Sequence, residues 1–145
     1  MTQEKEYINF FNSPIVSNCE IDGVKMYILE NRVFYVDIPR MKRITMELIE
    51  KGYKIINDNG GGLYYNVYHF HSYADVDPEV RKWASDPNGS NNTVSDAIVI
   101  GSIGQKILTD FYLKFDSPIK PTKIFFSLEK AIAWTEVQRK IYHSK

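Results

Sequence analysis

Five short apolar or aromatic runs in the chain are typical of β-strands. Two of them, 21–29 and 33–38, are separated by a turn-like break at residues 30–32, which predicts an antiparallel hairpin. Pro39 ends the second run, because proline has no N–H to donate to a neighbouring strand. Three later strands are predicted at 63–70, 96–101 and 123–126.

Four other stretches carry apolar residues at helical spacing. Residues typical of a helix start precede three of them: Thr45, Asp77 followed by Pro78, and Ser127. The predicted helices span 45–57, 78–85, 103–115 and 128–142. The inner faces predicted for the first, third and fourth are Met46, Ile49, Tyr53 and Ile56; Ile103, Ile107, Leu108, Phe111 and Phe115; and Leu128, Ala131, Ile132, Thr135 and Tyr142.

The resulting order, β-β-α-β-α-β-α-β-α, predicts an α/β domain. We expect a single-layer mixed sheet of about five strands, with an N-terminal antiparallel hairpin, then parallel crossovers, covered by about four helices. Residues 1–19 have weak periodicity and are expected to form an arm before a domain at 20–145. On this arm, Phe10 and Phe11 would dock either onto the body or onto a second subunit.

Composition narrows the function classes. The 145 residues carry 18 Lys+Arg and 18 Asp+Glu, and this balance argues against a general nucleic-acid binder, which needs a basic excess. No apolar run reaches the roughly 18–20 residues of a membrane helix, and the acidic first residues do not fit a signal peptide. The single cysteine, Cys19, cannot form an internal disulfide. We expect a cytoplasmic protein without nucleic-acid or membrane partners.

The stretch 95–140 carries three structural motifs. An apolar strand leads into a helix that ends in the aromatic-rich segment 111–114, and residues 121–123 start the last strand. Ser127, Glu129, Ala131 and Trp134 mark the last helix. With the hairpin at 21–38 and the helix near 45–57, this pattern resembles bacterial STAS/SpoIIAA-like domains over roughly residues 20–142. The resemblance implies a bacterial regulatory module that acts through protein contacts.

One motif of the resembled family is missing. STAS switches that are regulated by phosphorylation carry Asp-Ser-Ser/Thr-Gly at a helix start, and the counterpart here is Asp77-Pro78-Glu79-Val80. Because no hydroxyl or glycine is present in this segment, we expect no regulatory phosphorylation there. An anti-sigma partner is therefore not carried over.

Two glycine-rich segments are candidates for anion binding. Residues 60–62 follow a helix and open a strand, the reverse of a phosphate-binding loop, and are expected to be a connector. The segment Gly101-Ser102-Ile103-Gly104, with Lys106 in the first turn, has the order strand, turn, helix. Its amides and the helix dipole would hold an anion weakly, whereas the competing and favoured interpretation makes Ser102 a helix cap.

His69 and His71 share one face of a continuing strand, where they would bind a metal or move a proton. A metal needs three or four ligands, and Asp75 and Asp77 are the nearby candidates. The favoured interpretation is that both histidines are solvated at the strand end, so we expect no metal, no cofactor and no catalytic set.

The leading hypothesis is thus a non-catalytic regulatory or protein-interaction module of STAS-like type, whose protein partner the sequence does not identify. We also expect a homodimer, because zero net charge leaves little long-range repulsion between copies. An alternative is a carrier of a small apolar, lipid-like ligand, and an enzyme using His69 and His71 ranks third. A closed core would favour the module, an apolar cavity the carrier, and convergent polar groups in a cleft the enzyme.

Overall fold

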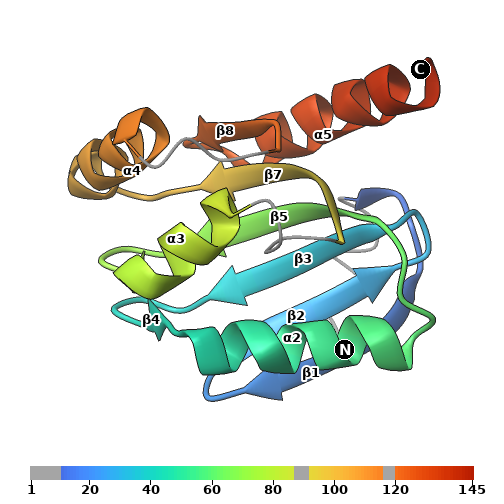
Figure 1. Cartoon of the computed structure of the whole chain (residues 1–145), viewed down its shortest axis with the longest axis horizontal. Helices are drawn as coiled ribbons and strands as arrows, with labels where there is room; N and C mark the ends of the chain where they lie inside the picture. Colours follow the sequence, from blue (N-terminus) through green and yellow to red (C-terminus); the bar gives the residue numbers. More distant parts are fainter. Residues whose placement is uncertain (1–10, 87–91, 116–119) are drawn as a thin grey trace.

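The computed structural model describes residues 11–86, 92–115 and 120–145 (Figure 1). The strands of the main sheet are β1 (Ile15–Ile21), β2 (Val24–Leu29), β3 (Val33–Ile38), β5 (Tyr64–Phe70), β7 (Thr93–Val99) and β8 (Thr122–Phe125). A separate two-stranded sheet consists of β4 (Arg43–Ile44) and β6 (Asp75–Val76). The helices are α2 (Met46–Asp58), α3 (Pro78–Ser85), α4 (Ile103–Phe115) and α5 (Leu128–His143).

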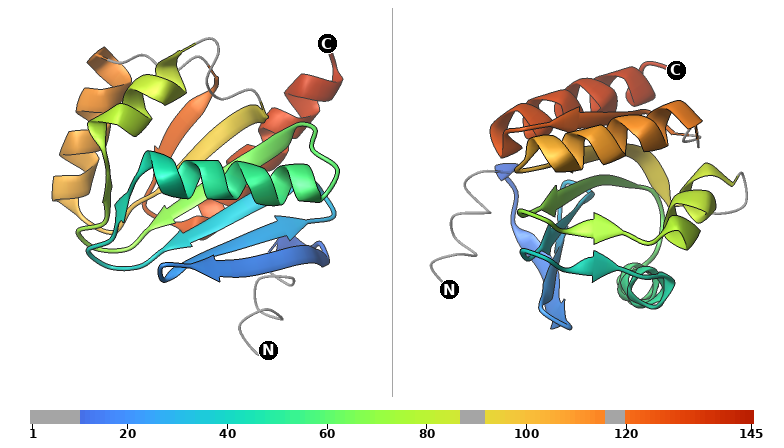
Figure 2. Two further views of the ribbon diagram at one scale, coloured as in Figure 1. Left: turned by 60° about the horizontal axis from the view of Figure 1, so that its bottom comes forward. Right: turned by 90° about the vertical axis from the view of Figure 1, so that its left-hand side faces the viewer.

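The main sheet has the strand order β1-β2-β3-β5-β7-β8. Strand β2 is antiparallel to both β1 and β3, whereas β3, β5, β7 and β8 are parallel to one another. Helices α2 and α3 cover one face, and α5 covers the other (Figure 2). The predicted α/β class with a mixed sheet is confirmed, but the sheet has six strands rather than about five.

The extra strand, β1, lies mostly in the segment 1–19 predicted to be an arm, and a turn at residues 22–23 joins it to β2. Asp22 and Gly23 both have positive φ, 52° and 84°, as the tight hairpin turn with two left-handed residues requires. The prediction of one strand over 21–29 is therefore wrong. The segment Ile15–Ile21 pairs with β2 as an edge strand, so residues 15–19 belong to the sheet and not to an arm.

The residues just before β1 are fixed to the body of the domain. Phe11 is buried, and its ring centroid lies 5.0 Å from that of Tyr35. The hydroxyl of Ser13 accepts a hydrogen bond from the amide of Asn31 at 2.9 Å. Phe11 therefore docks onto its own domain, whereas Phe10 lies outside the described residues.

Two apolar layers hold the fold together, one on each face of the sheet. The buried residues of α2 are Leu48, Gly52 and Ile56. Of the predicted face, Ile56 is therefore confirmed, whereas Met46, Ile49 and Tyr53 are only half-buried. On the other face, Ala131 and Thr135 of α5 are buried, and Tyr142 is exposed contrary to prediction.

Helix α4 departs furthest from its predicted packing. Ile103 is 75% exposed and Ile107 is 64% exposed, whereas Gln105 is buried. The predicted inner face is therefore wrong at these two isoleucines. The side chains of Leu108, Phe111 and Phe115 lie outside the described part of the structure. None of the helices in the described ranges is long and apolar enough to cross a membrane.

Candidate functional site

A cavity of about 390 Å³ lies between the sheet and helices α2, α3 and α4. Gly52 and Tyr53 of α2, Trp83 of α3 and Thr109 of α4 reach it from the helical side. Most of the wall is apolar, and its larger side chains include Met26, Phe34, Ile38, Ile44, Leu48, Ile49, Ile56, Tyr68, Phe70, Ile98 and Ile100. A cavity of this size and lining is typical of a small-molecule site.

A polar group interrupts the apolar wall on the sheet side. Asn66 of β5 and Asp96 of β7 are partners in the parallel register, so their side chains meet on the same face. The amide nitrogen of Asn66 donates to Asp96 Oδ1 and to Thr93 Oγ1, at 2.9 Å in each case. Asn66 is buried, and all three residues line the cavity.

Asp96 has an unusual acidity. Burial raises the pKa of this carboxyl from 3.8 to about 6, against the opposing effects of the Asn66 hydrogen bond and the charge of Lys120. The accessible part of its side chain lines the cavity, so it does not have the solvation of a surface carboxylate. A carboxyl with this pKa changes charge close to neutral pH.

Aromatic residues connect the two helices over the cavity. The Tyr53 ring of α2 meets the Trp83 ring of α3 edge-on, with centroids 5.5 Å apart. Both residues line the cavity. Tryptophan fluorescence from Trp83 is therefore expected to respond to molecules that enter.

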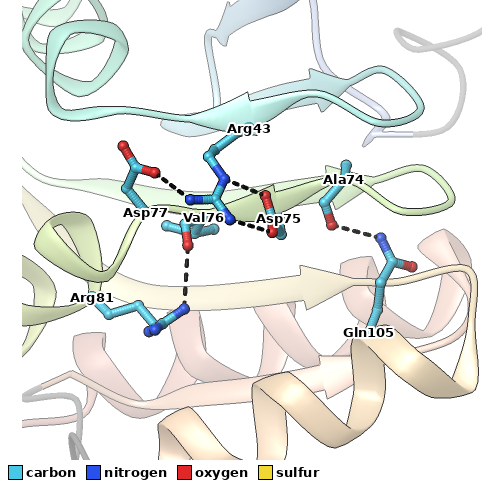
Figure 3. Close-up of polar contacts among 7 residues, drawn as sticks. All are labelled: Arg43, Ala74, Asp75, Val76, Asp77, Arg81 and Gln105. Carbon is cyan, nitrogen blue, oxygen red and sulfur yellow. Dashed lines mark hydrogen bonds and ion pairs between the residues drawn. The ribbon is translucent and has the colours of Figure 1, made fainter.

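Figure 3 shows the polar contacts around the small sheet, where Arg43, Asp75 and Arg81 also line the cavity. The Arg43 guanidinium donates to both oxygens of Asp75, at 3.1 and 3.0 Å, and to Asp77 at 2.9 Å. Arg81 donates to the carbonyl oxygen of Val76 at 3.2 Å. Because Asp77 is engaged by Arg43, it precedes α3 as predicted but makes no side-chain cap bond there. The remaining cap residues, Thr45 and Ser127, accept hydrogen bonds from backbone amides as predicted.

The predicted anion segment is a reciprocal helix cap in the structure. The Ser102 hydroxyl accepts from the amide of Gln105 at 3.2 Å, and the Gln105 side chain accepts from the amide of Gly101 at 2.9 Å. Lys106 pairs with Asp110 in the next turn. Ile103 and Gly104 are exposed at the helix start. These bonds give Ser102 the capping role that the sequence favoured, and a weak anion site at this turn stays a prediction.

The Gly60–62 segment connects α2 to β5, as expected. All three glycines have positive φ, at 95°, 62° and 92°. Arg32 closes the segment by donating to the carbonyl oxygens of Gly61 at 2.7 Å and Leu63 at 3.1 Å. This run therefore acts as a helix stop and not as a phosphate cradle.

The two predicted histidines lie close together, with ring centroids 4.4 Å apart. Their acidic neighbour is Asp37 and not the expected Asp75 or Asp77, which pair with Arg43. The reason is the parallel register, which places Asp37 of β3 beside His69 of β5. Strand alternation puts this cluster on the face of the sheet opposite the cavity.

Sequence reasoning missed the polar residues of the cavity. Asn66 and Asp96 each stand inside a strand that is otherwise mainly apolar or aromatic, LYYNVYHF and SDAIVI. An amide or carboxyl in such a run needs a buried partner, which is a usable signal for a site. Their contact with each other depends on the strand register, which the pattern of either segment alone does not reveal.

Comparisons with known proteins place the chain in one family. Residues 26–138 match the model of a domain of unknown function, DUF7793. No curated protein and no solved structure matches the chain. The matched range begins in β2 and ends in α5, so it includes the cavity, the Asn66–Asp96 pair and the histidine cluster. The chain belongs to the DUF7793 family.

Proposed function

We propose that this protein binds a small, mainly apolar molecule in the cavity between the sheet and helices α2, α3 and α4. The observation that carries the proposal is the apolar-walled cavity of about 390 Å³. Core side chains normally pack closely, and the walls of an empty space lose dispersion contacts. An apolar ligand would restore those dispersion contacts, and its binding would therefore be favourable.

The Asn66–Asp96 pair supports a ligand with one polar end. Among the described residues, the hydrogen bond from Asn66 engages Oδ1 of Asp96, and we place the polar end of the ligand at Oδ2. A hydroxyl or amine on the ligand would donate to this oxygen and stabilise its charged form. The proposed ligand class is therefore a lipid-like or aromatic molecule with a hydroxyl or amine end.

The sequence ranked a ligand carrier second, after a regulatory module. We now propose the ligand carrier as the leading function. The STAS-like resemblance and a non-catalytic regulatory role remain proposals beside it. The two roles are compatible, because a ligand beneath α2 and α3 would bias the positions of two helices that a protein partner can read. The proposal assigns only ligand binding, and no catalytic role, to Asn66 and Asp96.

Binding of N-phenyl-1-naphthylamine tests the proposal, because this probe is apolar, carries one N–H donor and fluoresces strongly in apolar surroundings. We expect saturable binding of one probe per chain. Ala84 of α3 lines the cavity, so Ala84→Phe should fill part of it and weaken binding at least tenfold.

The matched control is Ala133→Phe, the same substitution at an exposed position of α5 on the other side of the sheet. It should leave probe binding unchanged. Absence of saturable binding by the wild-type protein, or equal loss in both variants, would overturn the proposal.

A further inference from the structure

Asp37, His69 and His71 bring three metal-ligating groups together at the carboxyl ends of two parallel strands. The three groups each offer one ligand atom, and all three atoms lie within 4.8 Å of one another. Nε2 of His71 lies 2.6 Å from Oδ1 of Asp37. The two imidazole rings are stacked, with 28° between their planes.

The positions of these groups follow from the backbone. Asp37 and His69 are register partners in β3 and β5, and His71 continues the same strand face two residues later. The Tyr35 hydroxyl lies 2.8 Å from Nδ1 of His69 and helps to hold that ring in place. Two of the three ligands are therefore positioned by a central pair of the sheet and not by a loop.

The chemistry of the set fits a divalent transition metal. Imidazole nitrogen with one carboxylate oxygen is a common donor set for zinc, whose bonds to these atoms are about 2.0–2.2 Å. Tetrahedral binding needs donor atoms roughly 3.3 Å apart, so any pair must approach by at most about 1.5 Å, and the His71–Asp37 pair, now 2.6 Å apart, must open slightly. His71 is exposed and its side chain can rotate to make this adjustment.

The surroundings leave room for further ligands on the metal. Asp37 and His71 line a surface hollow of about 450 Å³ together with Ser72, Lys25 and Arg40. Water can enter such a hollow. A metal held by three protein groups would keep at least one position open towards it.

We propose that Asp37, His69 and His71 form a binding site for one divalent transition-metal ion of the zinc class. The ion replaces the proton between His71 and Asp37, and it takes its third protein bond from His69. The site is separate from the cavity, so the proposal does not rest on the proposed ligand.

Calorimetric titration of the untagged protein with zinc chloride tests the site, and cobalt(II) serves as the spectroscopic probe. We expect one zinc ion per chain with micromolar affinity and a visible cobalt(II) spectrum of low coordination number. Zinc should also shift the imidazole NMR signals of His69 and His71 but not those of His143. This NMR readout needs no variant.

His71→Gln and Asp37→Asn should each weaken zinc binding at least tenfold. His143→Gln is the matched control, because His143 is exposed at the end of α5, away from the cluster, and should leave binding unchanged. Circular dichroism confirms that each variant is folded. The proposal is overturned if the wild-type protein binds neither zinc nor cobalt(II) below millimolar concentration. It is also overturned if His143→Gln weakens binding as much as His71→Gln.

Discussion

Asp96 shows how neighbouring groups set the chemistry of a single residue. The carboxyl stands in a mainly apolar strand and lines an apolar cavity, and its pKa is about 6 rather than 3.8. The hydrogen bond from Asn66 and the charge of Lys120 only partly offset the loss of solvation. The ionised form is therefore destabilised in the folded protein relative to the unfolded chain.

This raised pKa predicts a pH-dependent stability. The folded protein holds the Asp96 proton more tightly than the unfolded chain, so stability should fall as pH rises from about 4 to about 6. At pH 7.5 the Asp96 carboxyl is ionised, and the free-energy cost of burying its charge is fully present. Asp96→Asn keeps an oxygen that accepts the hydrogen bond from Asn66, but it removes the charge. At pH 7.5 this substitution should therefore raise the free energy of unfolding by about 1–3 kcal/mol.

Urea unfolding from pH 4 to pH 8 measures this effect. The wild-type protein should lose stability relative to Asp96→Asn across pH 4–6, and the difference should be constant above pH 7. Asp58→Asn is the control, because Asp58 is an exposed partner of Lys54 and should keep the wild-type slope. Parallel wild-type and Asp96→Asn curves over pH 4–6 would contradict the argument.

Gly52 is a second residue whose surroundings permit a prediction. A Cβ added at this helical position would lie 3.6 Å from Phe34 Cζ and 3.7 Å from Met26 Sδ, which are ordinary contacts. Gly52→Ala should therefore stabilise the protein by about 0.5–1 kcal/mol, because alanine loses less backbone entropy in a helix. Thermal and urea unfolding measure the change.

Gly62→Ala is the matched control for this prediction and should have the opposite sign. Gly62 has a φ of 92°, and an added Cβ would lie 2.5 Å from Arg32 Nη2. A destabilised Gly52→Ala would show that α2 cannot accept even one methyl group against the sheet.

At the scale of elements, the start of α4 depends on one buried side chain. The Gln105 amide nitrogen donates to the carbonyl oxygens of His71 at 2.7 Å and Ala74 at 2.9 Å. The side-chain oxygen accepts from the amide of Gly101. This residue thus fixes the helix to the loop between β5 and β6, although Ile103 and Ile107 beside it are exposed.

Gln105→Glu should destabilise the protein by about 1–3 kcal/mol at neutral pH. The carboxylate still accepts from Gly101, but it cannot donate to the two carbonyl oxygens, which are then left facing a negative charge. Urea unfolding followed by circular dichroism measures the loss. Gln138→Glu makes the same change at a half-buried position of α5 and should cost much less. Equal losses would mean that the Gln105 contacts contribute little.

At the scale of the whole molecule, β1 forms one edge of the six-stranded sheet. An edge strand offers unpaired backbone groups to another chain. Val16 on this strand is 55% exposed. The homodimer stays a prediction, supported by the zero net charge of the chain. We expect its interface to lie along the edge strand β1.

Light scattering at micromolar to millimolar concentration tests self-association through β1. The wild-type protein should have the mass of a dimer, and Val16→Lys should shift it towards the monomer, because charged residues on an edge oppose strand pairing. Val137→Lys is the control, since Val137 is similarly exposed, at 50%, on α5. A monomeric wild-type protein at high concentration would refute the prediction, as would dissociation by both variants alike.

The sequence by itself determined most of the secondary structure, because that structure depends on local pattern and local hydrogen bonds. The strands at 33–38 and 63–70 and the helix starts after Thr45 and Ser127 follow from apolar spacing and cap residues. The missed turn at Asp22-Gly23 was also local, since an Asp-Gly pair is a strong turn signal. The two-residue strands β4 and β6 are too short to show any periodicity.

Only the tertiary structure decided which residues act together. Asp37 meets His69, and Asn66 meets Asp96, because of the register between parallel strands separated by a helix in the chain. The exposure of Ile103 and burial of Gln105 depend on how α4 rests on a loop that begins more than thirty residues earlier. The cavity exists because packing sets the distance of α2 and α3 from the sheet. Those distances come from contacts between residues far apart in sequence, which no local pattern contains.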